Sequence, residues 1–279
     1  MTPARILAVF GGGGAKAAAQ IGALRALEES GLRPTRYVGT SMGGVIAAGA
    51  ASGATAAELS ERFRAVKVTQ VARPRAFAPL AGLWFRSLLR PEPLHATLQR
   101  LVPERSFAEL KDPLTLTTVD ADSRELLTLG DGGLDLPLQI ALAATTALPV
   151  YYPPVEAVGR RLADGGLRAV LPLDVAAQFE ADLVVAVDVG PGFDEPPPKQ
   201  RVRAPGLLLA HDMGEGALMA QQAQDALARW RSTPGRARLI HVRPPLPRRA
   251  TFAAELFSEF ERAGYESTRD ALAKEQDHG

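Results

Sequence analysis

The sequence predicts an α/β fold built on a mostly parallel sheet. Two short apolar runs, Ile6–Phe10 and Tyr37–Val38, each end at glycine, and each is followed by a segment with helical character. A third run, Asp182–Val189, has the length and the valine content of a buried strand. Parallel neighbours need a crossover connection, so this alternation of strand, loop and helix is typical of a parallel sheet.

The other elements follow from the same patterns. After the first strand, Ala15–Ser30 carries apolar residues at helical spacing and closes at Gly31, while Gly39 is expected to break the second strand before a helix at Met42–Ala51. Further along we expect a hairpin of Leu114–Val119 and Glu125–Leu129, a helix at Leu136–Thr145, a surface loop at Pro191–Pro205, helices at Leu207–Trp230 and Phe252–Lys274, and a last strand at Arg238–Val242.

Composition restricts the class of protein. The 279 residues are 46% hydrophobic and 23% charged, a profile typical of a soluble globular chain. A net charge of +1 gives no basic field for nucleic acid, so no nucleic-acid partner is expected. The chain has no cysteine, which excludes disulfides and thiol catalysis. With no export signal and no run of roughly 18 apolar residues, a cytoplasmic location is expected.

The segment Gly39–Gly43 matches G-x-S-x-G and singles out Ser41 as a candidate nucleophile. This chemistry needs small neighbours, because the serine stands on a sharp turn between a strand and a helix that leaves its hydroxyl exposed. The flanking segments have strand and helix character, which supports that context. A helix capped by Thr40 or Ser41 is the simpler structural interpretation of the same residues.

Gly11–Gly14 is a second candidate, because consecutive glycines before a helix present backbone N–H groups to an anion. The anion can be a phosphate or the oxyanion of an acyl-transfer intermediate. A dinucleotide loop expects G-x-G-x-x-G and an acidic residue about 20 residues later. Lys16 or Ala17 stands at the third glycine position and the second strand ends without an acid, so the dinucleotide interpretation is rejected.

Asp164-Gly165-Gly166 is the third candidate, although Asp-Gly pairs are most often simple turns. The same tripeptide also occurs at Asp131-Gly132-Gly133. The pattern alone therefore does not choose between the two aspartates.

Together these segments resemble the patatin-like phospholipase family, especially its compact bacterial members. That family carries a glycine-rich oxyanion loop, then G-x-S-x-G, and later Asp-Gly-Gly or Asp-Gly-Ala. Further stretches agree in order: Ala144–Pro149, Tyr152–Pro154, Leu171-Pro172 and Ala181–Asp188. The first two resemble the stretch that leads into the family's catalytic aspartate, which selects Asp164 over Asp131. The resemblance covers roughly residues 5–190.

The resemblance implies a three-layer α/β/α fold and a serine hydrolase of lipid acyl esters, with no cofactor and no metal. It implies Ser41 as nucleophile and Asp164 as its base. The oxyanion and substrate would be bound by Gly12, Gly13, Gly14, Lys16 and Met42, with Gly39, Gly43, Gly165 and Gly166 as motif glycines. One domain, 1–279, is expected, with the motifs in 5–190 and a C-terminal completion in about 205–275.

Two alternatives remain open. The order Ser41, Asp164 and then His211 or His241 also fits the triad of an α/β-hydrolase esterase, although that fold needs more strands before its nucleophile. The second alternative is a catalytically weak lipid-binding or scaffold protein on the patatin-like fold. It is favoured by Lys16-Ala17, which stands where the family has arginine-glycine.

Residues 62–91 are expected to provide peripheral membrane contact. Seven arginines or lysines and no acidic residue fall in this segment. Basic residues favour an anionic lipid surface, and aromatic residues insert at the level of its headgroups. The residues with this composition are Arg73, Arg75, Phe77, Trp84, Phe85, Arg86 and Arg90. An ordinary pair of solvated helices with aromatic side chains facing the core is the alternative.

Overall fold

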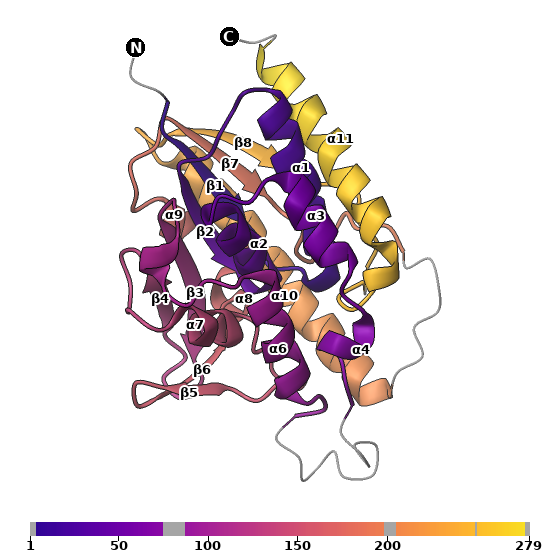
Figure 1. Cartoon of the computed structure of the whole chain (residues 1–279). Helices are drawn as coiled ribbons and strands as arrows, with labels where there is room; N and C mark the ends of the chain where they lie inside the picture. Colours follow the sequence, from indigo (N-terminus) through magenta and orange to yellow (C-terminus); the bar gives the residue numbers. More distant parts are fainter. Residues whose placement is uncertain (1–3, 75–86, 198–204, 249, 277–279) are drawn as a thin grey trace.

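The computed structural model describes residues 4–74, 87–197, 205–248 and 250–276 (Figure 1). Its centre is an eight-stranded sheet in the order β5-β6-β3-β2-β1-β7-β8, with β4 also paired to β3. The strands are β1 (Ile6–Phe10), β2 (Arg36–Thr40), β3 (Leu114–Asp120), β4 (Leu126–Gly130), β5 (Val155–Ala157), β6 (Arg160–Asp164), β7 (Leu183–Val187) and β8 (Arg238–Val242). Strands β3, β2, β1, β7 and β8 run parallel, whereas β4 and β6 are antiparallel to β3.

Helices surround this sheet. The longer ones are α1 (Ala18–Glu29), α2 (Ser41–Ala51), α3 (Ala56–Arg64), α6 (Pro91–Leu101), α7 (Leu138–Thr145), α10 (Gly206–Ser232) and α11 (Phe257–Gln276). Short turns of helix occur at η1 (Gly14–Ala17), α4 (Val68–Val71), η2 (Phe107–Glu109), α8 (Gly166–Ala169), α9 (Leu173–Ala176) and η3 (Ala254–Leu256).

The alternation of side chains along β1 produces two cores, one on each face of the sheet. Ile6, Ala8 and Phe10 pack on one face with residues of α1, α2 and α11. Leu7 and Val9 pack on the other with residues of α9 and α10. Figure 1 shows α1, α3 and α11 together on one side of the sheet. The predicted three-layer α/β/α architecture with a mostly parallel sheet is therefore confirmed.

Several boundaries differ from those predicted. Strand β2 continues through Gly39 to Thr40, because α2 packs so closely on this strand that a residue without a Cβ is required there. Helix α2 begins at Ser41 itself, and α11 begins at Phe257, after the short η3 turn. The hairpin of β5 and β6 was not predicted, since its polar sequence lacks a clear alternation of apolar residues.

Helices α1 and α11 cross at a pair of glycines. A Cβ built on Gly22 would lie 1.8 Å from the backbone oxygen of Glu261, and one built on Gly264 would lie 1.8 Å from that of Ala19. The two backbones therefore approach more closely than any side chain allows. This crossing fixes the C-terminal helix against the helix that follows the glycine-rich loop.

We expect Gly22→Ala to destabilise the protein by about 1–3 kcal/mol, because the added methyl group forces the two helices apart. Gly214→Ala is the matched control, since no atom lies within 4 Å of a Cβ at this helical position. The control should be neutral or stabilising by up to about 1 kcal/mol. Urea unfolding of both variants measures the difference, and equal stabilities would contradict the close crossing.

Candidate active site

Ser41 occupies a strained turn between β2 and α2. Its φ is 55°, in the left-handed region that residues with a Cβ seldom adopt. The Ser41 backbone N–H donates to the Thr145 hydroxyl oxygen at 2.9 Å. Just before it, the Thr40 hydroxyl donates to the Ala169 carbonyl at 2.8 Å and lies 2.6 Å from the Thr117 hydroxyl. Contacts from three other elements thus hold the turn in a conformation that it would not adopt alone.

Gly43 brings this turn against the glycine-rich loop. A Cβ at Gly43 would lie 2.4 Å from the carbonyl oxygen of Gly11 and 2.7 Å from that of Phe10. The first turn of α2 and the end of β1 are therefore in backbone contact. The G-x-S-x-G spacing has a physical reason here, because a side chain at Gly43 would separate the serine from the loop.

Asp164 lies at the end of β6, directly beside Ser41. The Ser41 hydroxyl donates to Asp164 Oδ2 at 2.6 Å, and the Gly166 backbone N–H donates to Oδ1 at 2.8 Å. Asp164 is only 2% exposed. Burial, helped by the carboxylate of Glu215, raises the pKa of its carboxyl from 3.8 to about 7 against the opposing effects of the two hydrogen bonds.

The amide groups of the glycine-rich loop fall into two sets. Gly12 N–H donates to the Val170 carbonyl at 2.8 Å, so it has an acceptor within the protein. For the amides of Gly13, Gly14 and Met42, the described residues provide no acceptor. The site therefore contains two glycine amides and one amide at a helix N-terminus as free donors. The prediction for Gly12 changes accordingly: it contacts Ser41, but its N–H is already used.

Lys16 is buried and ion-paired. Its Nζ lies 2.6 Å from Glu195 Oε1, and both side chains are about nine-tenths buried. It also lies 3.5 Å from the Gly190 carbonyl oxygen. Lys16 thus joins the glycine-rich loop to the 190–195 segment, and its charge is already balanced by a carboxylate.

A cavity of about 430 Å³ connects these groups. Ser41, Asp164, Gly13, Gly14 and Met42 lie in its wall. Most of the remaining wall is apolar, with contributions from Phe63, Val66, Val71, Leu94, Leu101, Leu148, Tyr151, Tyr152, Met219, Phe252 and Phe257. Ser41 and Asp164 therefore open onto a pocket suited to a hydrocarbon chain.

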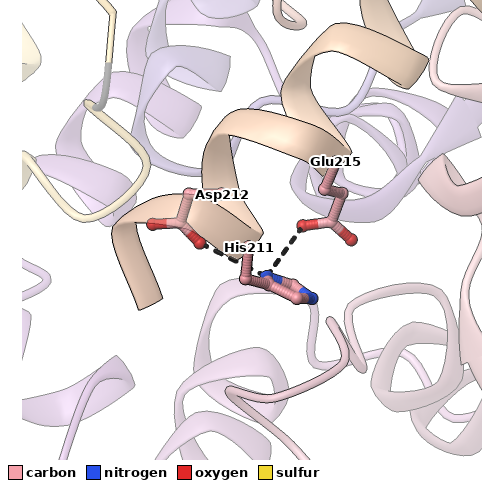
Figure 2. A group of neighbouring side chains, drawn as sticks. All are labelled: His211, Asp212 and Glu215. Atoms are coloured by element: carbon pink, nitrogen blue, oxygen red, sulfur yellow. Dashed lines mark ion pairs between the residues drawn. The ribbon is translucent and has the colours of Figure 1, made fainter. Parts of the chain in front are cut away.

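The cavity wall also contains carboxylates of α10 that the sequence analysis did not identify. Figure 2 shows Asp212 and Glu215 on this helix with His211 between them. Burial raises the pKa of Glu215 above its usual range. The Tyr151 hydroxyl lies 2.9 and 3.0 Å from the two oxygens of Asp212. In the sequence, the pattern that could have indicated this cluster is the i, i+4 spacing of His211 and Glu215, but this spacing is too common to indicate a site by itself.

These three residues are the group, within the described chain, whose side chains could together hold a metal ion. Their potential ligand atoms lie within 4.8 Å of one another. The three side chains are only partly buried, and the carboxylate of Asp212 already accepts from Tyr151. We assign them no metal.

A comparison with models of protein families shows which family this chain belongs to. The model of patatin-like phospholipase matches residues 8–177. The chain belongs to the patatin-like phospholipase family. Membership supports lipid acyl hydrolase activity at the level of the family.

Curated patatin-like relatives agree. An uncharacterized NTE family protein of Mycobacterium tuberculosis is 31% identical over 200 residues, which cover 69% of this chain and 52% of the relative. Human patatin-like phospholipase domain-containing protein 6 is 30% identical over 194 residues, covering 68% of this chain and 14% of that protein. The chain thus matches about half, or much less, of the length of these relatives.

The fold is also shared with solved structures of low sequence identity. ExoU of the Pseudomonas aeruginosa type III secretion system, in complex with SpcU, aligns with a TM-score of 0.50 at 15% identity. The alignment covers 98% of this chain and 52% of ExoU. At this identity the likeness shows the fold alone. Within the described part of the chain, no helix is both long and apolar enough to cross a membrane.

The histidines proposed for a triad lie beside carboxylates other than Asp164. Nδ1 of His211 lies 3.6 Å from Asp212, and Nε2 of His241 lies 3.5 Å from Asp188. Within the described residues, the Ser41 hydroxyl makes its hydrogen bond directly to Asp164. The second Asp-Gly-Gly segment is also elsewhere, since the carboxylate of Asp131 pairs with Arg36.

Residues 62–91 are described only in part, since Arg75, Phe77, Trp84, Phe85 and Arg86 lie outside the described residues. Phe63, Val66 and Val71 pack against the core and line the cavity. Arg73 and Arg90 are exposed. These three apolar side chains thus face inward.

We expect Asp164→Asn to stabilise the protein at pH 8 by up to about 4 kcal/mol. With a pKa of about 7 when folded and 3.8 ordinarily, Asp164 binds a proton in the folded state at pH values where the unfolded chain has released it. The stabilisation of the wild type by this bound proton is complete below about pH 4 and is lost as the pH rises through 7. Urea unfolding from pH 4 to 8 should therefore show the wild type losing stability relative to the variant. The opposite trend would mean that the carboxyl pKa is not raised.

Proposed function

We propose that this protein is a serine hydrolase of lipid acyl esters, with Ser41 as the nucleophile and Asp164 as the general base. The observation that carries the proposal is the 2.6 Å hydrogen bond from Ser41 Oγ to a buried carboxylate in the wall of an apolar cavity. Family membership supports the class of substrate. Oligomeric partners and further domains are not part of the proposal.

In this mechanism Asp164 accepts the Ser41 proton as Oγ attacks the ester carbonyl. The tetrahedral intermediate collapses, the leaving alcohol takes the proton from Asp164, and an acyl-serine remains. Water then attacks the acyl-serine while Asp164 accepts its proton, and collapse of this second intermediate releases the fatty acid and returns the proton to Ser41 Oγ. A carboxylate with an ordinary pKa is a weak base, but a pKa of about 7 suits proton transfer near neutral pH.

The oxyanion would be held by the free amides around the glycine-rich loop. Gly13, Gly14 and Met42 provide three N–H groups that border the same cavity as Ser41. Each such donor contributes on the order of 3–4 kcal/mol where it has been measured in other enzymes. Lys16 is assigned a positioning role, because its ion pair with Glu195 fixes the loop from behind.

Three finer points remain proposals alongside this one. We infer that residues 1–279 form one hydrolase domain, because α11 packs on α1 and β8 extends the same sheet. We keep the predicted cytoplasmic location with peripheral membrane contact. The contact predicted for residues 62–91 is kept as one candidate surface.

We expect Ser41→Ala and Asp164→Asn each to lower hydrolysis of a short-chain p-nitrophenyl ester by at least about a thousandfold, since each removes one half of the nucleophile–base pair. Asp131→Asn is the matched control, because it alters the same tripeptide and should leave activity nearly unchanged. Ester hydrolysis is followed at pH 8 with folded protein.

The alternatives make different predictions in the same assay. A large loss on changing His211 or His241, together with full activity of Asp164→Asn, would indicate a histidine triad. A wild type that hydrolyses no ester, across a screen of glycerophospholipids, acylglycerols and thioesters, would favour the scaffold protein.

A fluorophosphonate should label Ser41 alone, and the labelling rate should rise with pH through about 7 and then level off. The reason is that only the carboxylate form of Asp164 accepts the serine proton, and burial raises the pKa of that carboxyl to about 7. Mass spectrometry locates the adduct, and initial rates from pH 5 to 9 give the profile. Labelling of the Ser41→Ala variant, or a rate independent of pH, would overturn the assignment.

A further inference from the structure

The residues that are exposed on the first half of α10 are all apolar, and the side chains of His211 and Asp212 beside them are about a third exposed. Leu207, Met213 and Leu218 are 85%, 65% and 68% exposed. We call the outer stripe of α10 the exposed residues Leu207, Ala210, Met213, Gly214, Ala217 and Leu218. The carboxylates of the same stretch, Asp212 and Glu215, line the cavity instead. This arrangement reverses the usual amphipathic helix, whose polar face meets solvent.

These residues form one continuous surface. Successive helical residues are rotated by about 100°, which places Leu207 and Leu218 about 20° apart and Met213 at one edge of the stripe. The stripe is about 17 Å long. It ends where polar residues return to the same face, at Gln221 and Asp225, which hydrogen-bond to each other at 2.8 Å.

The stripe continues into the mouth of the cavity. Met213 and Ala217 belong both to the stripe and to the cavity wall. Phe193, which is 55% exposed, lines the same cavity. The exposed Arg248 stands beside it and donates to the Phe193 carbonyl at 3.3 Å. No carboxylate of the described residues pairs with Arg248.

Nothing in the described structure covers this surface. A Cβ built on Gly206 or Gly214 would have no neighbour within 4 Å. A protein partner seated on the stripe would also cover Met213 and Ala217 at the cavity rim and obstruct substrate entry. A lipid surface would bring acyl chains to the same rim, and its phosphate groups would meet the exposed guanidinium of Arg248, which pairs with no carboxylate of the described residues.

We propose that the outer stripe of α10, together with Phe193 and Arg248, is the surface that docks on a lipid interface and turns the cavity mouth toward it. This inference rests on the proposed lipid hydrolysis for its choice of partner. It assigns the contact to a different segment from residues 62–91. The apolar side chains enter the interface and Arg248 contacts lipid phosphate at its edge.

The test uses the full chain with Ser41→Ala, so that binding is measured without hydrolysis. Co-sedimentation with phosphatidylcholine vesicles containing one fifth phosphatidylglycerol, before and after Leu207→Gln/Leu218→Gln, should show at least about tenfold weaker binding. Both leucines lie outside the cavity wall, so the same double variant in active protein should hydrolyse a soluble short-chain ester as the wild type does. Leu207→Gln alone should give a smaller loss of vesicle binding. This single variant replaces the double variant in the test if the double variant is misfolded.

Val158→Asn is the matched control, because Val158 is 62% exposed and does not line the cavity. It should bind vesicles as the Ser41→Ala protein does. Arg73→Gln/Arg90→Gln tests the competing segment in the same assay.

Three results would overturn the proposal: absence of vesicle binding before any α10 change, binding unaffected by the two leucine changes, or a dimer that the leucine changes convert to a monomer in light scattering. Loss of binding in the Arg73/Arg90 variant alone would move the contact to residues 62–91. Failure of the proposed hydrolysis is detected in a different assay, as absence of ester cleavage. The comparison of vesicle binding between variants can still be interpreted in that case.

Discussion

The site depends on one buried carboxyl. Asp164 receives a hydrogen bond from the Ser41 hydroxyl and one from the Gly166 amide, and no cation of the described residues lies against it. Burial with so few donors disfavours the charged form of a carboxyl. The resulting rise in pKa toward neutrality would give the aspartate the basicity that the proposed Ser41–Asp164 pair requires. Because of the same burial, ionisation of Asp164 above neutral pH lowers the free energy of unfolding of the protein.

Keeping that carboxyl in place constrains several elements at once. Strand β6 enters the sheet antiparallel to β3, with Asp164 opposite Thr118, and the Asp164 N–H donates to the Ala147 carbonyl. From the other side, the strained φ of Ser41 delivers its hydroxyl to Oδ2. The strain is maintained by contacts from α7, β3 and α8. A sheet that is parallel at its centre and antiparallel at this edge is what brings residues 41 and 164 together.

The sequence predicted the parts of this arrangement that are local. Strands β1 and β8 have the predicted bounds, and the turn at Ser41 follows from small residues between a strand and a helix. The interruption of β2 at Gly39 was a wrong prediction, because glycine's weak strand propensity was outweighed by the close approach of α2. The choice of Asp164 over Asp131 came from family resemblance, since both tripeptides are equivalent as local patterns.

What the sequence could not predict is long-range pairing. Glu195 neutralises Lys16 across 179 positions, and the cavity brings α10 against residues of the first strand–helix turn. The apolar and acidic residues of α10 alternate as in any amphipathic helix, and only the fold determines which side is buried. In this fold the inward side of α10 lines the cavity, where the carboxylate of Glu215 contributes to the raised pKa of Asp164. The acidic side of the helix therefore faces inward, and its apolar side remains exposed. The orientation of α10 that places Glu215 near Asp164 therefore also leaves its apolar side exposed at the cavity mouth.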